Sequence, residues 1–99
     1  MSRAFTRDEM RDKFIDQCRD IARYWANTTG TPEERCMGVV HSILTLIDGC
    51  SSGFPCALTL TCEPHPDDKA FHQAEDENWV EPETAINADD MLHELLYRR

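Results

Sequence analysis

The sequence has few basic residues and no long apolar run. Ten Lys and Arg side chains stand against nineteen Asp and Glu, which gives a formal net charge of −9 in 99 residues. A protein that binds nucleic acid by electrostatic attraction needs a basic surface, so we predict no direct nucleic-acid partner. The same charge disfavours anionic membrane surfaces, and no apolar run approaches the roughly 20 residues that span a bilayer. We therefore predict no membrane association.

Other absences bear on the compartment and on cofactors. The N-terminal stretch lacks the apolar segment of a secretory signal, and five cysteines cannot all pair within one chain. Both features predict a cytoplasmic protein whose cysteines stay reduced. The chain has no Cys-x-x-Cys pair and no phosphate-binding glycine-rich motif. We therefore predict no bound cofactor and no structural metal.

The composition is that of a globular protein with an uneven charge. With 40% apolar and 29% charged residues, the chain fits a single domain over residues 1–99. Between Glu63 and Glu94, eleven acids are opposed by Lys69 alone. A block of one sign is usually a solvated face and less often a binding surface.

Two N-terminal segments carry helix signals. Thr6 and Glu9 form a capping-box pattern ahead of an apolar stripe of helical period, which predicts a helix over about 7–26. A Thr-Pro pair repeats the start signal, and the apolar stretch after it predicts a second helix over about 32–48. This second helix is apolar almost all round, so we expect it to pack on several sides.

The later half of the chain mixes strand and helix patterns. Residues 57–62 alternate apolar and polar side chains, which predicts a half-buried strand. Its partner is either residues 79–86 or the same strand of a second molecule, and the latter pairing makes a homodimer. A short helix over about 67–74 and a C-terminal helix over about 88–98 complete the prediction. The expected fold class is α+β and helix-rich.

The densest polar cluster spans residues 62–72. Imidazole, thiolate and carboxylate groups are suitable ligands for a first-row metal ion. Its main members are His65, Asp67, Asp68 and His72. The spacing matches no closed metal site, so the main interpretation is a turn whose aspartates cap the next helix. A small metal-binding protein or enzyme that uses this cluster is the alternative.

Two further histidines lie on predicted helices. His93 comes four residues after Asp89, and on one helix face the two side chains would lie close together. His41 shares a stripe of the second helix with Asp48. For His41 the favoured interpretation is a buried, hydrogen-bonded side chain.

One acidic stretch has no evident structural role. Acids at helix starts are stabilised by the positive end of the helix, but those between residues 75 and 83 do not lie at a predicted start. With the aromatic side chain among them, they are Glu75, Asp76, Glu77, Trp79, Glu81 and Glu83. We expect these residues to bind a protein partner that has a basic surface.

Several short runs resemble a group of small uncharacterised bacterial and phage proteins. The runs are RCMGVVHSIL at 35–44, DG at 48–49, FP at 54–55, PHPDD at 64–68, His72 and LHE at 92–94. The likeness covers about residues 35–96 and carries no known activity. It implies a bacterial or mobile-element setting and a compact helical domain. Together with the charge, it favours a small acidic interaction or inhibitor protein without catalysis.

Overall fold

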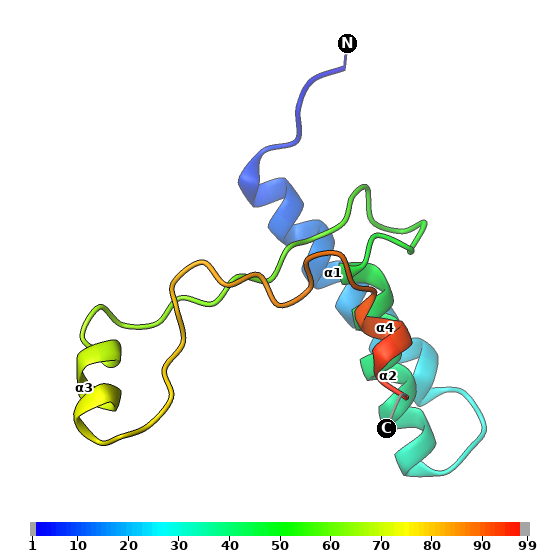
Figure 1. Ribbon diagram of the computed structural model, residues 1–99. Coiled ribbons are helices and arrows are strands. Elements are labelled where there is room, and N and C mark those ends of the chain that lie inside the picture. The colour runs from blue at the N-terminus through cyan, green and yellow to red at the C-terminus, as the bar shows by residue number, and fades with distance from the viewer. Residues whose placement is uncertain (1, 98–99) are drawn as a thin grey trace. The chain divides into compact units, whose positions relative to one another are not determined.

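The computed structural model describes residues 2–97 (Figure 1). Within them lie four helices: α1 (Arg7–Ala26), α2 (Pro32–Ile47), α3 (Asp68–Ala74) and α4 (Leu92–Leu95). The chain divides into two compact units. Thr59–Asp90 is one of them, named here the acidic unit, and the other described residues form the helical unit. No helix of this part of the chain combines the length and the apolar composition needed to cross a bilayer.

The two predicted N-terminal helices are confirmed, because their start signals act locally. At α1, the Thr6 hydroxyl accepts from the Glu9 N–H at 3.1 Å, and the Glu9 carboxylate accepts from the Thr6 N–H at 2.9 Å. At α2, Thr31 and Glu34 form the same reciprocal pair. Each capping box satisfies backbone donors that a helix start otherwise leaves unpaired.

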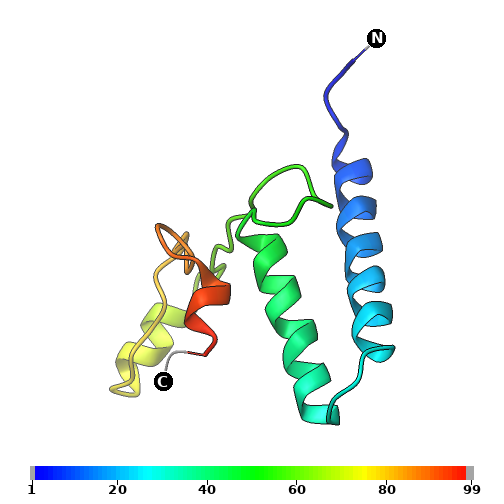
Figure 2. The same ribbon diagram turned by 90° about the vertical axis from the view of Figure 1, so that its right-hand side faces the viewer.

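Helices α1 and α2 run antiparallel and lie side by side (Figure 2). A Cβ atom on Gly38 of α2 would lie 2.6 Å from Cε2 of Trp25 in α1, well inside contact distance. The Trp25 indole N–H donates to the Ser42 hydroxyl at 2.8 Å, which holds the ring against α2. The missing side chain at Gly38 therefore allows the two helices to approach closely.

The core of the helical unit is small and lies near the C-terminal end of α2. Leu46, Ile47 and Phe54 are its buried hydrophobic residues, and Phe14 of α1 meets Phe54 edge to face with ring centroids 6.0 Å apart. Gly49, with φ of 82°, provides the left-handed turn expected after this helix. Most of the remaining apolar surface of the unit is only partly covered.

The predicted α+β fold class is wrong. The described residues contain no sheet, and residues 57–62 do not form a strand. What remains of the predicted pairing with residues 79–86 is one isolated antiparallel bridge between Thr61 and Ala85.

Around this bridge, the N–H groups of Cys62, Glu83 and Ile86 donate to the carbonyls of Thr84, Cys62 and Leu60. The pairing does not extend into a ladder, because two other donors of residues 57–62 bond elsewhere. The Leu58 N–H donates to the carbonyl of Ile47 at 2.8 Å, and the Leu60 N–H donates to the side chain of Asn87 at 2.9 Å. Pro82 has no N–H to offer, so the opposing segment cannot extend the pairing. Residues 57–62 therefore offer no strand for the predicted pairing with a second molecule, and the homodimer itself stays a prediction.

The last two helices differ from prediction in length. Helix α3 starts at Asp68, one residue later than expected, and ends at Ala74 as expected. The C-terminal helix predicted over 88–98 is wrong, because α4 is the single turn Leu92–Leu95, and residue 98 lies outside the described residues. Asp89 has φ of 62°, a left-handed conformation that a right-handed helix cannot include.

Candidate functional site

The acidic unit accounts for the entire formal net charge of the protein. Ten of the nineteen acids lie in Thr59–Asp90, where Lys69 is the single basic residue. The nine acids elsewhere in the sequence are matched by nine Lys and Arg. The acidic unit therefore carries −9, and the rest of the sequence is formally neutral.

No residue of Thr59–Asp90 is buried. Its large apolar side chains are substantially exposed: Phe71 by 60%, Trp79 by 38%, Val80 by 50% and Ile86 by 55%. Segments shorter than about 40 residues usually need a metal, a disulfide or another chain to hold a fold. The acidic unit thus presents apolar side chains and carboxylates without a core of its own.

Trp79 is held among polar neighbours. Its indole N–H donates to the Glu81 carboxylate at 2.8 Å, and Lys69 Nζ lies 5.3 Å from the ring centroid. Lys69 Nζ also lies 3.3 Å from Glu81 Oε1. The hydrogen bond from Trp79, and then the contact with Lys69, hold the pKa of Glu81 below its ordinary value. These contacts orient an exposed aromatic side chain of the kind that anchors protein interfaces.

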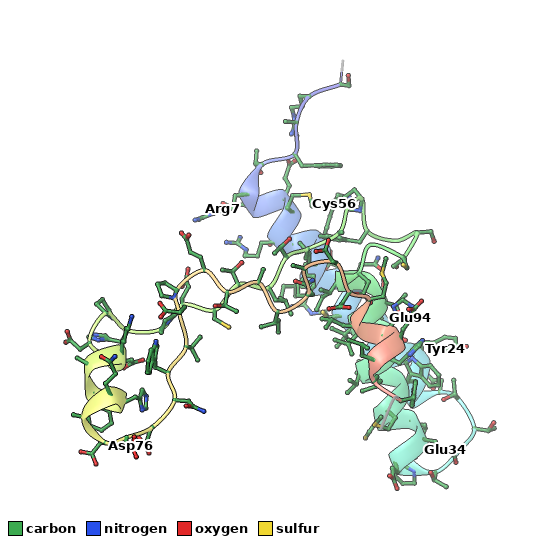
Figure 3. The ribbon with its side chains drawn as sticks, viewed as in Figure 1. Arg7, Tyr24, Glu34, Cys56, Asp76 and Glu94 are labelled. Carbon is green, nitrogen blue, oxygen red and sulfur yellow. The ribbon has the colours of Figure 1, made fainter. Side chains whose placement is uncertain are left out.

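The predicted acidic stretch contains paired and unpaired carboxylates. Glu81 is paired as above, and Glu77 lies 3.0 Å from Nδ1 of His72. Three carboxylates of this stretch have no hydrogen bond or ion pair within the part of the chain that the structure describes: Glu75, Asp76 and Glu83. Two of these residues, Asp76 at the end of α3 (Figure 3) and Glu83, have left-handed φ values of 56° and 62°. A residue other than glycine in the left-handed conformation costs free energy, and such residues cluster at functional sites.

The polar cluster over residues 62–72 separates into local pairs. His65 Nδ1 accepts from the Asp67 N–H at 3.1 Å, and the Asp68 carboxylate accepts from the His65 N–H at 3.1 Å. His72 pairs with Glu77 instead of joining them. Neither aspartate caps α3, contrary to expectation. Among residues 2–97, no group of three or more His, Cys, Asp or Glu is placed to hold a metal ion.

A second site, which the sequence reasoning missed, joins α2 to α4. The Asp48 side chain has no exposed surface, and its carboxylate accepts from the N–H groups of Leu92 and His93 at 2.9 and 2.8 Å. The same carboxylate lies 2.6 Å from Nδ1 of His93, whose side chain is 20% exposed. Asp48 therefore caps the start of α4 from a distant part of the sequence. One sequence signal could have indicated this site: Asp48 directly follows an apolar helix, where its carboxylate would be buried. A buried carboxylate needs several hydrogen-bond donors, and these must come from another part of the chain.

The surroundings of this pair correct two expectations. The His41 ring lies 5.6 Å from that of His93 and 5.7 Å from that of Tyr97. The Nδ1 atom of His41 is buried without a hydrogen-bond partner among the described residues. The prediction of a hydrogen-bonded His41 side chain is therefore wrong for this atom. Asp89 lies outside α4, so it shares no helix face with His93.

The chemistry of the Asp48–His93 pair is that of an anchor. A buried carboxylate on a histidine Nδ1 can orient the imidazole for proton transfer. Here the same carboxylate also binds two backbone N–H groups, and no serine, threonine or cysteine among residues 2–97 hydrogen-bonds to this imidazole. The pair therefore fastens α4 to α2.

We expect this anchor to weaken at acid pH. Burial raises the pKa of Asp48, but the hydrogen bonds from His93 and Leu92 outweigh it and bring the pKa below its ordinary value of 3.8. As the pH is lowered, the Asp48 carboxyl therefore takes up a proton at a higher pH in the unfolded chain than in the folded one. Its contribution to stability is complete above the ordinary pKa and is lost as the pH falls through the pKa of the folded state. Amide exchange should show the protection of Leu92 and His93 decreasing below about pH 4. An Asp48→Asn variant should show no such step, and identical pH profiles for the two proteins would contradict the assignment.

Comparison of the chain with protein-family models, with curated proteins and with solved structures finds no significant match. The resemblance to small bacterial and phage proteins thus stays a prediction. Conclusions about function depend on the two units themselves.

Proposed function

We propose that the protein is a small cytoplasmic interaction or inhibitor protein, of bacterial or mobile-element origin and without catalysis. In this proposal the acidic unit binds a protein partner that has a basic surface. The observation that supports it most is the placement of the whole net charge in a unit with no buried residue. All five cysteines are free thiols, in agreement with a reducing compartment.

The proposed contact surface combines an aromatic anchor with an acidic rim. Trp79 borders a recess of about 290 Å³ that Cys62, His72 and Val80 also line. The unpaired carboxylates described above have no interaction to break before they meet a cation. A partner with an exposed apolar side chain surrounded by Lys and Arg would fit this combination. The long-range attraction between opposite charges would also accelerate association.

The test compares two variants that lose equal charge. One carries E75Q, D76N and E83Q in the acidic unit, and the other carries D12N, D16N and D20N in α1. Each variant and the wild-type protein serve as bait in a bacterial lysate, and recovered proteins are purified and titrated against each bait. We expect the acidic-unit variant to bind at least about tenfold more weakly, and the α1 variant to bind as the wild-type protein does.

Two further measurements complete this test. Binding should weaken steeply as NaCl is raised, because salt screens exposed charges. Substituting Trp79 by alanine should cost about 30-fold or more in affinity if Trp79 is the anchor. Equal losses in the two charge variants, or binding that does not respond to salt, would rule the proposal out.

A further inference from the structure

Helix α2 has a third apolar side that neither α1 nor α4 covers. Helix α1 packs against the side that carries Gly38, and the C-terminal segment lies on the side that carries His41. The remaining side of α2 carries Cys36, Val40 and Ile43, which are spaced four and three residues apart and so lie on one face of the helix. Val40 is 42% exposed, and Cys36 is exposed as well. Helix α2 is thus apolar on nearly all sides, but contacts within one chain cover only two of them.

This side of the hairpin carries a recess beside a protrusion. The recess, of about 320 Å³, lies between α1 and α2, and small side chains line much of it, among them Ala22, Ala26 and Cys36. Val40 follows one helical turn after Cys36 and projects into solvent. A surface with a recess beside a protrusion can be complementary to itself across a two-fold axis, because each copy fills the recess of the other.

Charge favours a second copy over the basic partner of the acidic unit. Arg35 is the single charged residue that lines the recess, and no carboxylate lines it. The exposed acids of α1 lie in ion pairs with neighbouring arginines, as Asp16 does with Arg19 and Asp20 with Arg23. Since the sequence outside the acidic unit is formally neutral, the charges of the helical unit itself do not oppose the approach of two such surfaces. A basic partner would meet no carboxylate in the recess.

We infer that this surface, named here the hairpin face, packs on the same face of a second copy to form a symmetric homodimer. Its residues are Ala22, Ala26, Cys36, Val39, Val40 and Ile43. In the dimer the two helical hairpins form a four-helix arrangement, and the small core around Leu46 is supplemented by the apolar seam between the copies. All residues of this interface belong to the helical unit, and the inference does not rest on the proposed partner of the acidic unit.

The main test is the mass in solution of two variants with the same substitution. Sedimentation equilibrium should give the wild-type protein about twice its chain mass of 11.4 kDa. Val40→Asp should be monomeric, with a dimer dissociation constant raised at least about 100-fold, because a carboxylate would be buried at an apolar seam. Val80→Asp, at a similarly exposed valine of the acidic unit, should leave the dimer intact. A monomeric wild-type protein at high micromolar concentration, or a dimeric Val40→Asp, would overturn the inference.

Thiol cross-linking gives a second measurement that does not depend on a destabilising substitution. Cys36 lies on the hairpin face, so a short bis-maleimide reagent should join two wild-type chains through it. Cys36→Ser should abolish the cross-linked dimer, and Cys56→Ser, which removes another exposed thiol, should not. Cross-linking that survives Cys36→Ser and is lost in Cys56→Ser would place the contact elsewhere and overturn the inference.

Discussion

Replacing Asp48 by asparagine is expected to lower the free energy of unfolding by about 2–4 kcal/mol. The carboxylate has no exposed surface and accepts hydrogen bonds from two backbone N–H groups and from the His93 ring. An asparagine amide has the same shape but offers one acceptor oxygen, and its NH₂ group would face N–H donors. The loss should concentrate in α4, because the anchor joins that helix to α2.

Chemical denaturation and amide exchange measure this loss together. Glu94→Gln is the matched control, because it removes one carboxylate from α4 itself (Figure 3), where Glu94 is exposed. We expect that control to change stability by less than about 0.5 kcal/mol. Exchange in Asp48→Asn should accelerate at Leu92 and His93 before it accelerates in α1. If the two variants prove equally stable, Asp48 is not the anchor of α4.

Replacing Gly38 by alanine is expected to destabilise the protein by about 2 kcal/mol, or to lower Tm by about 8–16 °C. In a free helix the same change would stabilise by about 1 kcal/mol, because alanine is the better helix former. The sign reverses here because the added Cβ would overlap the Trp25 ring. To move away, the ring must give up its hydrogen bond to Ser42, or the helices must separate.

Repeating Gly38→Ala in a protein that lacks the Trp25 ring tests whether the overlap with this ring causes the destabilisation. In a Trp25→Leu protein the ring is absent, so Gly38→Ala should become neutral or stabilising by about 1 kcal/mol. Thermal melts of the four proteins complete the cycle. The close approach of the two helices would be refuted if Gly38→Ala had the same effect in both backgrounds.

Local signals in the sequence predicted what depends on neighbouring residues. The capping pairs of α1 and α2 each join residues three apart, so the chain itself brings donor and acceptor together. The end of α2 was predicted for the same reason, since Gly49 adopts its left-handed turn without help from distant residues. The start of α3 was predicted to within one residue.

The errors lie where distant groups compete for the same backbone donors. Residues 57–62 have the alternation of a strand, but the side chain of Asn87 takes the Leu60 N–H, and Ile47 takes that of Leu58. The C-terminal helix was predicted too long because its real cap, Asp48, lies in a distant part of the sequence, directly after α2. A one-dimensional pattern contains no information on which distant acceptor will reach a given donor.

The amino-acid sequence is sufficient to establish the acidic excess, its concentration in the second half and the two long helices, because charge is a sum and capping is local. Folding determines which acids remain unpaired, which apolar side chains stay exposed and where the buried acid finds its donors. Glu81 and Glu83 are equivalent by sequence, yet Lys69 and Trp79 bind one of them and leave the other available. Such differences arise from the three-dimensional placement of donors, which brings Lys69 to Glu81 across twelve residues and aims the Trp79 ring at the same carboxylate.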